Sequence, residues 1–342
     1  SSLNILIRTT APADLFHGIP RSTVHPPEDP IDFGVVEHDA LAIDVPATWT
    51  RITDLLARSP QIIARERAFV ETHGVDLILT DIAYLPGEVA HAAGIRCLAI
   101  SNFTWEWIYA SYVAGDPTKA ALVEQVHHMY AKMEAFFRLP FGHATETFPR
   151  VLDVPLVVNH PQWDRQQAAQ HIGLDPADPR PRILIGMRGG VSNAALRAAV
   201  ESNLHFLFLS TQPYPGNPPE HFRLVKLDGT LDFTDLLSAC HAVISKLGYG
   251  TIAECIACQT AILWPPRTGF PEQAIMEQVC PQYLRMRQLP LTDYQAGHWA
   301  PHLQALLAQP APPQTMNTNG AQVCAAAVLG TPSAPFARPA VR

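Results

Sequence analysis

The chain has 342 residues, 47% of them hydrophobic and 16% charged, which is enough for two domains with their own cores. Lys and Arg number 24 against 31 Asp and Glu, giving a formal net charge of −7, so we expect no general attraction to nucleic acids or anionic membranes. No apolar run approaches the roughly 20 residues of a transmembrane helix, and the opening SSLNILIRTT lacks the pattern of a signal peptide. We therefore expect a cytoplasmic protein.

Short β-rich runs alternate with longer amphipathic segments in the first half. This alternation is typical of parallel α/β units. The expected strands cover residues 3–9, 75–81 and 96–101, and the expected helices lie within 47–73, around 87–93 and across much of 105–137. A short apolar stretch follows at 154–159.

The second half repeats the alternation after a segment rich in Pro and Asp, 175–182, which we interpret as an inter-domain linker. The expected domains are residues 1–160 and 161–308. A tail at 309–342, rich in Pro and Ala, is expected to be mostly disordered. The expected elements of the second half are strands at 183–187, 205–210, 223–227, 242–245 and 260–263 and a helix at 301–307.

Two glycine-rich loops follow expected strands of the second domain. Ligands bind at the carboxyl ends of the strands in open parallel sheets, so these loops are the first places to inspect. In RGGVSN, Gly189 and Gly190 could present backbone N–H groups to a phosphate, although a plain turn is equally compatible with them.

The second loop, SKLGYGTIAE, is followed by a helix expected to begin near Gly250 and Thr251. The N–H groups at that helix start would favour an anion. Thr251 could then donate to a phosphate oxygen, and Glu254 could accept hydrogen bonds from a sugar's hydroxyls. Alternatively, Thr251 is the N-cap and Glu254 its capping-box partner.

A third loop, WPPRTGFPEQ, places Glu272 and Gln273 at a helix start on the same expected rim, suited to the hydroxyls of a sugar. An exposed helix start could also carry both residues without a function. Nearby, Cys255 and Cys258 form a CxxC pair inside an expected helix, where core packing is a better interpretation than metal binding or redox chemistry.

Polar and aromatic residues of the first domain are candidates for an acceptor site. Asp81 ends an expected strand and could act as a general base, or it could simply cap the next helix. In NFTWEWIYASY, we expect Asn102 and Trp105 to face the cleft, whereas dense aromatic residues also serve as core anchors. His25 and His38 are weaker base candidates because no motif surrounds them.

These motifs resemble the donor-binding region of GT-B glycosyltransferases. The similarity is to the lipid II-forming N-acetylglucosaminyltransferases and, more closely, to the glycosyltransferase-like half of arabinokinases, in both the SKLGYGTIAE and NFTWEWIYASY segments. The motif positions of the first segment are Lys246, Gly248, Tyr249, Gly250, Thr251 and Glu254.

The resemblance implies two Rossmann-like domains facing a cleft and inverting transfer of a sugar from a nucleoside diphosphate to an unknown acceptor. No cofactor is implied. No DxD-type metal motif lies near these loops, so we expect no obligatory metal. The alternatives are a non-catalytic nucleotide-sugar-binding protein and a nucleotide-sugar epimerase or hydrolase on the same fold.

The chain departs from this family at its beginning. Members open with a strand, a G-H-G-x-G-H loop and a helix, about 30 residues in all, and no such loop occurs in this sequence. Either the sequence starts after that unit, or this member has lost it, and we expect the strand at 3–8 to border a gap or an unusual edge. The family histidine is absent with the loop, so Asp81 is the remaining candidate base. A sugar-kinase domain, which arabinokinases add, is not implied.

Overall fold

The computed structural model describes residues 3–16, 18–187 and 191–330, so the predicted Gly189 and Gly190 lie outside the described residues. The chain divides into two compact units. Unit 1 comprises Ser1–Val36, Asp44–Arg138 and Ala144–Leu152, and unit 2 comprises Glu37–Ile43, Leu139–His143 and Asp153–Arg342. The interpretation of 175–182 as a linker is wrong, because that segment lies inside unit 2, where Arg180 is paired with Asp178.

Unit 2 is built on a six-stranded parallel sheet with the order β11-β10-β9-β12-β13-β14. Counted within the unit this order is 3-2-1-4-5-6, the order of a doubly wound Rossmann sheet. The strands are β9 (Arg182–Ile185), β10 (Leu207–Ser210), β11 (Phe222–Leu224), β12 (Ala242–Ile244), β13 (Ala261–Trp264) and β14 (Met286–Gln288). The short β14 was not predicted from the sequence.

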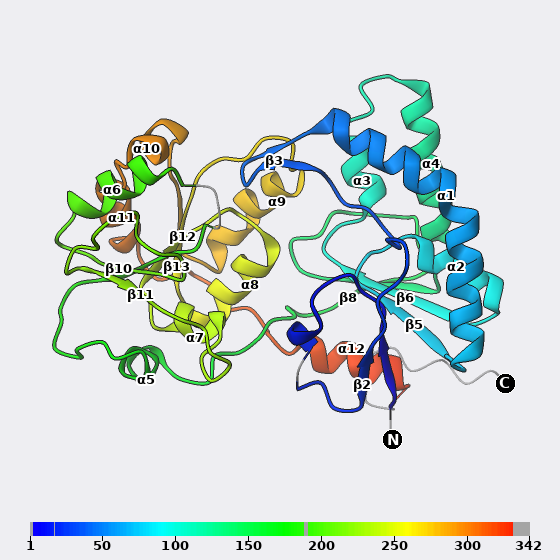
Figure 1. Ribbon diagram of the computed structural model, residues 1–342, viewed down its shortest axis with the longest axis horizontal. Coiled ribbons are helices and arrows are strands. Elements are labelled where there is room, and N and C mark those ends of the chain that lie inside the picture. Colours follow the sequence, from blue (N-terminus) through cyan, green and yellow to red (C-terminus); the bar gives the residue numbers. More distant parts are fainter. Residues whose placement is uncertain (1–2, 17, 188–190, 331–342) are drawn as a thin grey trace. The chain divides into compact units, whose positions relative to one another are not determined.

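Helices cover both faces of this sheet (Figure 1) because alternate strand residues point to opposite sides. Leu184 of β9 packs in the core shared with α5, α7, α8 and α9, whereas Ile183 and Ile185 pack in the core shared with α6, α10 and α11. The helices are α5 (Arg165–His171), α6 (Asn193–Glu201), α7 (Phe233–Ser238), α8 (Tyr249–Cys258), α9 (Glu272–Val279), the 3₁₀ turn η2 (Cys280–Gln282), α10 (Leu291–Ala296) and α11 (Ala300–Leu307).

Unit 1 contains a four-stranded sheet with the order β5-β6-β7-β8, in which β5 with β6 and β6 with β7 pair in parallel. The prediction of helix across 105–137 is wrong at its end. There, β7 pairs with β6 and buries Phe136 and Phe137, so sheet pairing overrides the helical pattern. The elements are α1 (Val45–Thr72), β5 (Leu77–Thr80), α2 (Leu85–Ala93), β6 (Arg96–Ser101), α3 (Trp105–Ala110), α4 (Pro117–Ala131), β7 (Ala135–Arg138) and β8 (Val151–Asp153).

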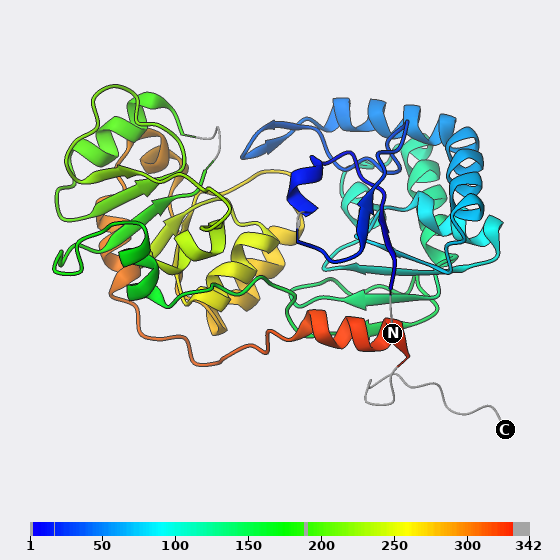
Figure 2. The same cartoon turned by 60° about the horizontal axis from the view of Figure 1, so that its bottom comes forward.

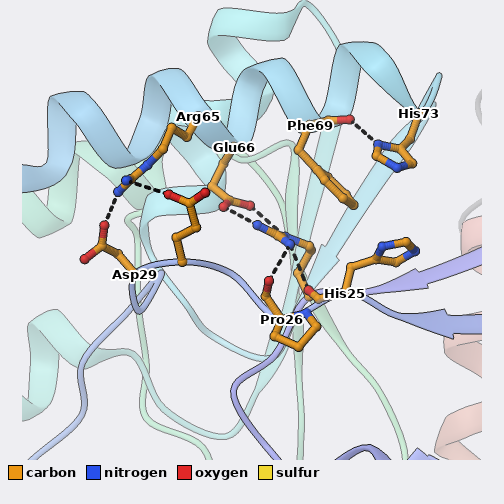
Figure 3. A network of polar contacts seen from close by, with 9 residues as sticks. His25, Pro26, Asp29, Arg65, Glu66, Phe69 and His73 are labelled. Carbon is orange, nitrogen blue, oxygen red and sulfur yellow. Dashed lines mark hydrogen bonds and ion pairs between the residues drawn. The ribbon is translucent and has the colours of Figure 1, made fainter.

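The first strand stands outside that sheet. β1 (Ile5–Ile7) pairs in parallel with β2 (Ser22–Val24) in a separate two-stranded sheet, and the 3₁₀ turn η1 (Ala13–Phe16) lies between them. The expectation that the strand at 3–8 borders a gap or an unusual edge of the domain's sheet is therefore not met, because β1 belongs to a different sheet. Figure 3 shows how the region is attached to α1: Glu66, Phe69 and His73 face His25 and Pro26, and Arg65 reaches Asp29.

The prediction of a disordered tail is wrong for residues 320–330. Gly320–Leu329 forms helix α12, coloured red in Figure 2. The N–H of Gly320 donates to the Leu156 carbonyl over 3.0 Å, and the Leu156 N–H donates to Asn317 over the same distance. A Cβ at Gly320 would lie 2.1 Å from the Pro155 carbonyl oxygen, so the backbone approach at this position requires glycine. Composition alone does not reveal this contact.

Candidate functional site

The strand order of unit 2 selects one point on the edge of its sheet. β9 and β12 are neighbours, but the strands that follow each of them extend toward opposite edges. Open α/β sheets bind ligands outside the carboxyl ends of the strands at such a switch point. The described residues at this point are those of the β12–α8 loop, Ser245–Gly248, which the sequence analysis singled out.

Helix α8 begins at this point with a backbone that no side chain caps. Gly248 is its N-cap and makes no side-chain cap hydrogen bond, and no acidic residue lies in the first turn. The capping-box alternative for Thr251 and Glu254 is therefore wrong, because Thr251 already lies inside the helix. The N–H groups of the first turn and the positive end of the helix dipole are left to face an anion.

Two glycines of this turn have no structural reason to be glycine. Gly248 has an ordinary extended conformation (φ −121°, ψ 149°), and Gly250 lies within the helix. A Cβ built at either position meets no described atom within 4 Å. Because neither backbone strain nor packing requires glycine here, the free space beside the helix start is the feature that their small size preserves.

Glu254 points toward helix α7. It is half-buried, and its Oε1 atom accepts a hydrogen bond from the Thr234 hydroxyl over 3.3 Å. Burial raises the pKa of the Glu254 carboxyl, while the hydrogen bond from Thr234 opposes that rise. Thr234 thus orients the carboxylate that the sequence analysis assigned to sugar hydroxyls. It was missed from the sequence because it lies 20 residues away.

At the start of α9 the two predicted residues differ. The side chain of Gln273 is used within the protein: its Oε1 accepts from the Arg267 N–H over 3.2 Å and its Nε2 donates to Glu277 over 2.6 Å. Glu272, in contrast, has a buried Oε2 atom without a hydrogen-bond partner among the described residues. Burial raises the pKa of this carboxyl. Glu272 is thus the better placed of the two to bind a ligand.

The predicted Lys246 is joined on the same rim by a second cation, Arg267, which was not found from the sequence. Lys246 follows β12, Arg267 follows β13, and both contact Glu37. Glu37 belongs to β3 (Glu37–Asp39), which forms an antiparallel hairpin with β4 (Ala42–Ile43). The hairpin precedes α1 in the sequence and is nevertheless part of unit 2.

In unit 1, the predicted Asp81 has an acidic neighbour, Asp32. Burial, together with the Asp81 charge, raises the pKa of Asp32 to about 6, although the nearby Trp105 side chain opposes the shift. Asp81 is exposed to solvent, but the surrounding protein still raises its pKa by desolvation. Carboxyls tuned toward neutral pH are typical of general bases. Asp32 sits in an irregular loop without a motif, so the sequence did not reveal it.

Asn102 and Trp105, which were expected to face a cleft, are more buried than that expectation implies. Asn102 is 4% exposed, and its side-chain nitrogen has no hydrogen-bond partner among the described residues. The Trp105 ring stacks on Tyr109 with centroids 5.8 Å apart, and its edge covers Gly34, where a Cβ would lie 2.8 Å from it. Trp105 therefore holds the 32–34 loop in place, and only part of its ring is accessible.

The remaining candidate residues from the sequence are two histidines and two cysteines. His25 packs against Phe69 of α1 and against His73, the C-cap of that helix, as Figure 3 shows. His38 is exposed on β3. Cys255 and Cys258 are buried in α8 as free thiols, which confirms the core-packing interpretation. Among the described residues no group of three or more His, Cys, Asp and Glu could hold a metal ion.

Comparisons with known proteins agree with this architecture. No family model matches the chain. Solved structures cover nine-tenths of it, among them the calicheamicin glycosyltransferase CalG4 (TM-score 0.58, 15% identity, 90% of this chain and 83% of that one) and the glycotransferase of kitacinnamycin (0.62, 13%, 90% and 84%). The chain shares the GT-B glycosyltransferase fold. UGT89C1 of Arabidopsis thaliana, complexed with UDP-L-rhamnose, is a further match (0.57, 14%, 91% and 84%).

One curated protein matches in sequence. L-arabinokinase of Arabidopsis thaliana is 25% identical over 277 residues, which is 80% of this chain and 26% of that protein. The chain therefore spans about a quarter of the length of the curated relative it matches. Within the described residues, no helix combines the length and apolar character needed to cross a membrane.

Proposed function

We propose that the chain is a glycosyltransferase that binds a nucleoside-diphosphate sugar on unit 2 and offers acceptor-binding residues on unit 1. The observation that carries this proposal is the uncapped start of α8 at the switch point of a Rossmann sheet, with free space beside Gly248 and Gly250. The shared fold and the complex of UGT89C1 with UDP-L-rhamnose support it. A cytoplasmic location stays a prediction from the sequence.

On the donor side, the proposal gives a chemical role to the N–H groups at the start of α8, to two carboxylates and to two cations. The N–H groups at Gly250 and Thr251 would bind the diphosphate, whose negative charge grows as the bond to the sugar breaks. Glu254, oriented by Thr234, would accept hydrogen bonds from neutral hydroxyls of the ribose, and Glu272 from those of the sugar. Nearby cations, Lys246 and Arg267, would neutralise the leaving group without an obligatory metal.

On the acceptor side, inverting transfer needs a general base within hydrogen-bond reach of the acceptor hydroxyl. The acceptor oxygen forms a bond to the anomeric carbon, the bond from that carbon to the diphosphate breaks, and the base takes the hydroxyl proton. We propose Asp81 for this role, with Asp32 as its partner. Burial and the charge of Asp81 raise the pKa of Asp32 to about 6, so at mildly acidic pH Asp32 is largely protonated.

Two other functions are compatible with the same fold. A nucleotide-sugar hydrolase or epimerase would use water or the sugar itself in place of an acceptor, and a non-catalytic protein would bind the nucleotide sugar without changing it. Neither is favoured by a described feature. The neighbouring carboxyls Asp32 and Asp81 of unit 1 favour an enzyme, because carboxyls with raised pKa values are typical of general acids and bases.

One incubation distinguishes these functions. Nucleotide sugars radiolabelled in the sugar are incubated with the protein, with and without a panel of hydroxyl-bearing acceptors, and the products are separated. Acceptor-dependent release of nucleoside diphosphate together with a labelled glycoside is expected. Labelled free sugar without acceptor would indicate a hydrolase, and an altered sugar still attached to the nucleotide an epimerase. Binding without any product would leave only the non-catalytic role.

A further inference from the structure

The β3–β4 hairpin is attached to the loop between β13 and α9. The Thr268 N–H donates to the Leu41 carbonyl over 2.9 Å, and Ala42 and Thr268 form a parallel β-bridge. The Arg267 Nε donates to the Ala40 carbonyl over 3.1 Å. A segment that precedes α1 is thereby held beside the Glu272 carboxyl.

Arg267 is fixed in place at the centre of this contact. Its side chain is only 4% exposed, and its guanidinium carbon lies 3.2 Å from the centroid of the Phe270 ring. A buried cation is costly unless a negative group accompanies it. Arg267 therefore favours anionic neighbours on this rim, and Glu272 is close enough to interact with it electrostatically, as Glu37 does.

Glu37 provides such an anionic neighbour through a single oxygen atom. Its Oε1 lies 3.0 Å from Nη2 of Arg267 and 3.2 Å from Nζ of Lys246. Two cations that converge on one carboxylate oxygen form the arrangement that also binds a phosphate oxygen. Glu37 thus occupies a site of the size and charge of an oxyanion.

Glu37 and Arg267 differ in how firmly the surrounding structure holds their side chains. The Glu37 side chain is 39% exposed and lies on a two-stranded hairpin whose register shifts between Glu37 and Asp39. Arg267, by contrast, is buried, stacked and hydrogen-bonded through Nε. An exposed carboxylate on an irregular strand can withdraw at low cost, whereas the guanidinium stays. Exchange of the anion is therefore easier than movement of the cation.

We infer that Lys246 and Arg267 form an oxyanion subsite that Glu37 occupies in the ligand-free protein, and that a diphosphate displaces Glu37 when it binds. The subsite lies next to the start of α8, because Lys246 is two residues before the N-cap Gly248. The subsite itself requires only a diphosphate. The inference that this diphosphate carries a nucleoside rests on the proposed function. Glu37 acts in this view as an internal competitor that lowers the affinity for anions.

The test measures the affinity of inorganic pyrophosphate and of nucleoside diphosphates by calorimetry in the full chain. Glu37→Gln removes the competing charge and should tighten pyrophosphate binding by about 3- to 10-fold, the effect of a partly exposed ion pair. The matched control is Glu220→Gln, which removes one negative charge from an exposed position of unit 2. This variant should leave the affinity for pyrophosphate unchanged. Lys246→Gln should weaken binding, and the double variant Glu37→Gln/Lys246→Gln should lose most of the gain.

The outcomes separate this inference from the proposed function. Tighter pyrophosphate binding in Glu37→Gln without any nucleotide binding would support the subsite and contradict the nucleotide-sugar site. Equal or weaker pyrophosphate binding in a folded Glu37→Gln protein would overturn the inference, even if nucleotides bind normally. The inference is also overturned if Glu220→Gln gains as much as Glu37→Gln, or if neither the wild type nor any variant binds pyrophosphate.

Discussion

The hydroxyl of Thr234 donates a hydrogen bond to Glu254 across 3.3 Å, which joins the start of α7 to the middle of α8, two helices that are separated in the sequence by β12. The carboxylate is thereby aligned by α7 and not by the backbone of its own helix. A mere cap for α8 would contact the first-turn N–H groups, and the N-cap of α8 makes no such side-chain bond.

Replacement of Glu254 therefore tests a ligand role. A charge-assisted hydrogen bond to a hydroxyl is worth about 1.5–3 kcal/mol, so Glu254→Ala should weaken nucleotide binding roughly 10- to 150-fold by calorimetry. Thr234→Val, which leaves the carboxylate in place but releases it, should give a smaller loss. Unchanged affinity in a folded Glu254→Ala protein would remove this residue from the site.

The pKa of Asp32 predicts how stability depends on pH. Its folded value of about 6 lies above the ordinary 3.8. Between about pH 4 and about pH 6, Asp32 loses its proton in the unfolded chain but keeps it in the folded chain. The free energy of unfolding should therefore fall as the pH rises through this range and then level off. Asp32→Asn should remove the part of this fall that Asp32 causes and raise the unfolding free energy at pH 7.5 by up to about 3 kcal/mol.

Denaturant unfolding at pH 3.5 and pH 7.5 checks that expectation. The wild type and Asp32→Asn should differ little at the lower pH, where Asp32 is protonated in both states. Loss of transferase activity in the more stable variant would mark Asp32 as a residue kept for function. A variant that is less stable at pH 7.5 would show that the carboxylate has favourable contacts, contrary to this account.

Much of the fold follows from local patterns. The strand at 96–101 coincides with β6, because a continuous apolar run between a glycine and a polar loop has few alternatives. β7 and α12 were missed because long-range partners decide them: β6 pairs with the former, and Leu156 anchors the latter. The same limit applies to the site. The α8 loop is visible in the sequence, whereas Glu37, Thr234 and Asp32 become relevant only through neighbours distant in the chain.

The attachment of β1 to α1 predicts a stability effect away from the site. Arg8 pairs with Glu66 through two hydrogen bonds, one of them 2.9 Å long from Nε, and the Glu66 side chain is only 12% exposed. Glu66→Gln should cost about 1.5–3 kcal/mol in unfolding free energy, because Arg8 loses its charged partner. Glu71→Gln is the matched control: its pair with Arg67 is half exposed, so the loss should be below about 1 kcal/mol. Equal losses of unfolding free energy would mean that burial does not strengthen the Arg8–Glu66 pair.

The central claim is that a nucleoside diphosphate binds against the start of α8, and Gly250→Ala tests it most directly. The added methyl group meets no atom of the described residues within 4 Å, and alanine favours a helix by up to about 1 kcal/mol over glycine, so the variant should be at least as stable as the wild type. The methyl group would, however, fill space that the proposed function assigns to the phosphates. Calorimetric titration with a panel of nucleoside diphosphates should show binding to the wild type and at least about tenfold weaker binding, or about 1.4 kcal/mol, to Gly250→Ala. Equal affinity of the two folded proteins would contradict the account, because the ligand would then bind somewhere other than this helix start.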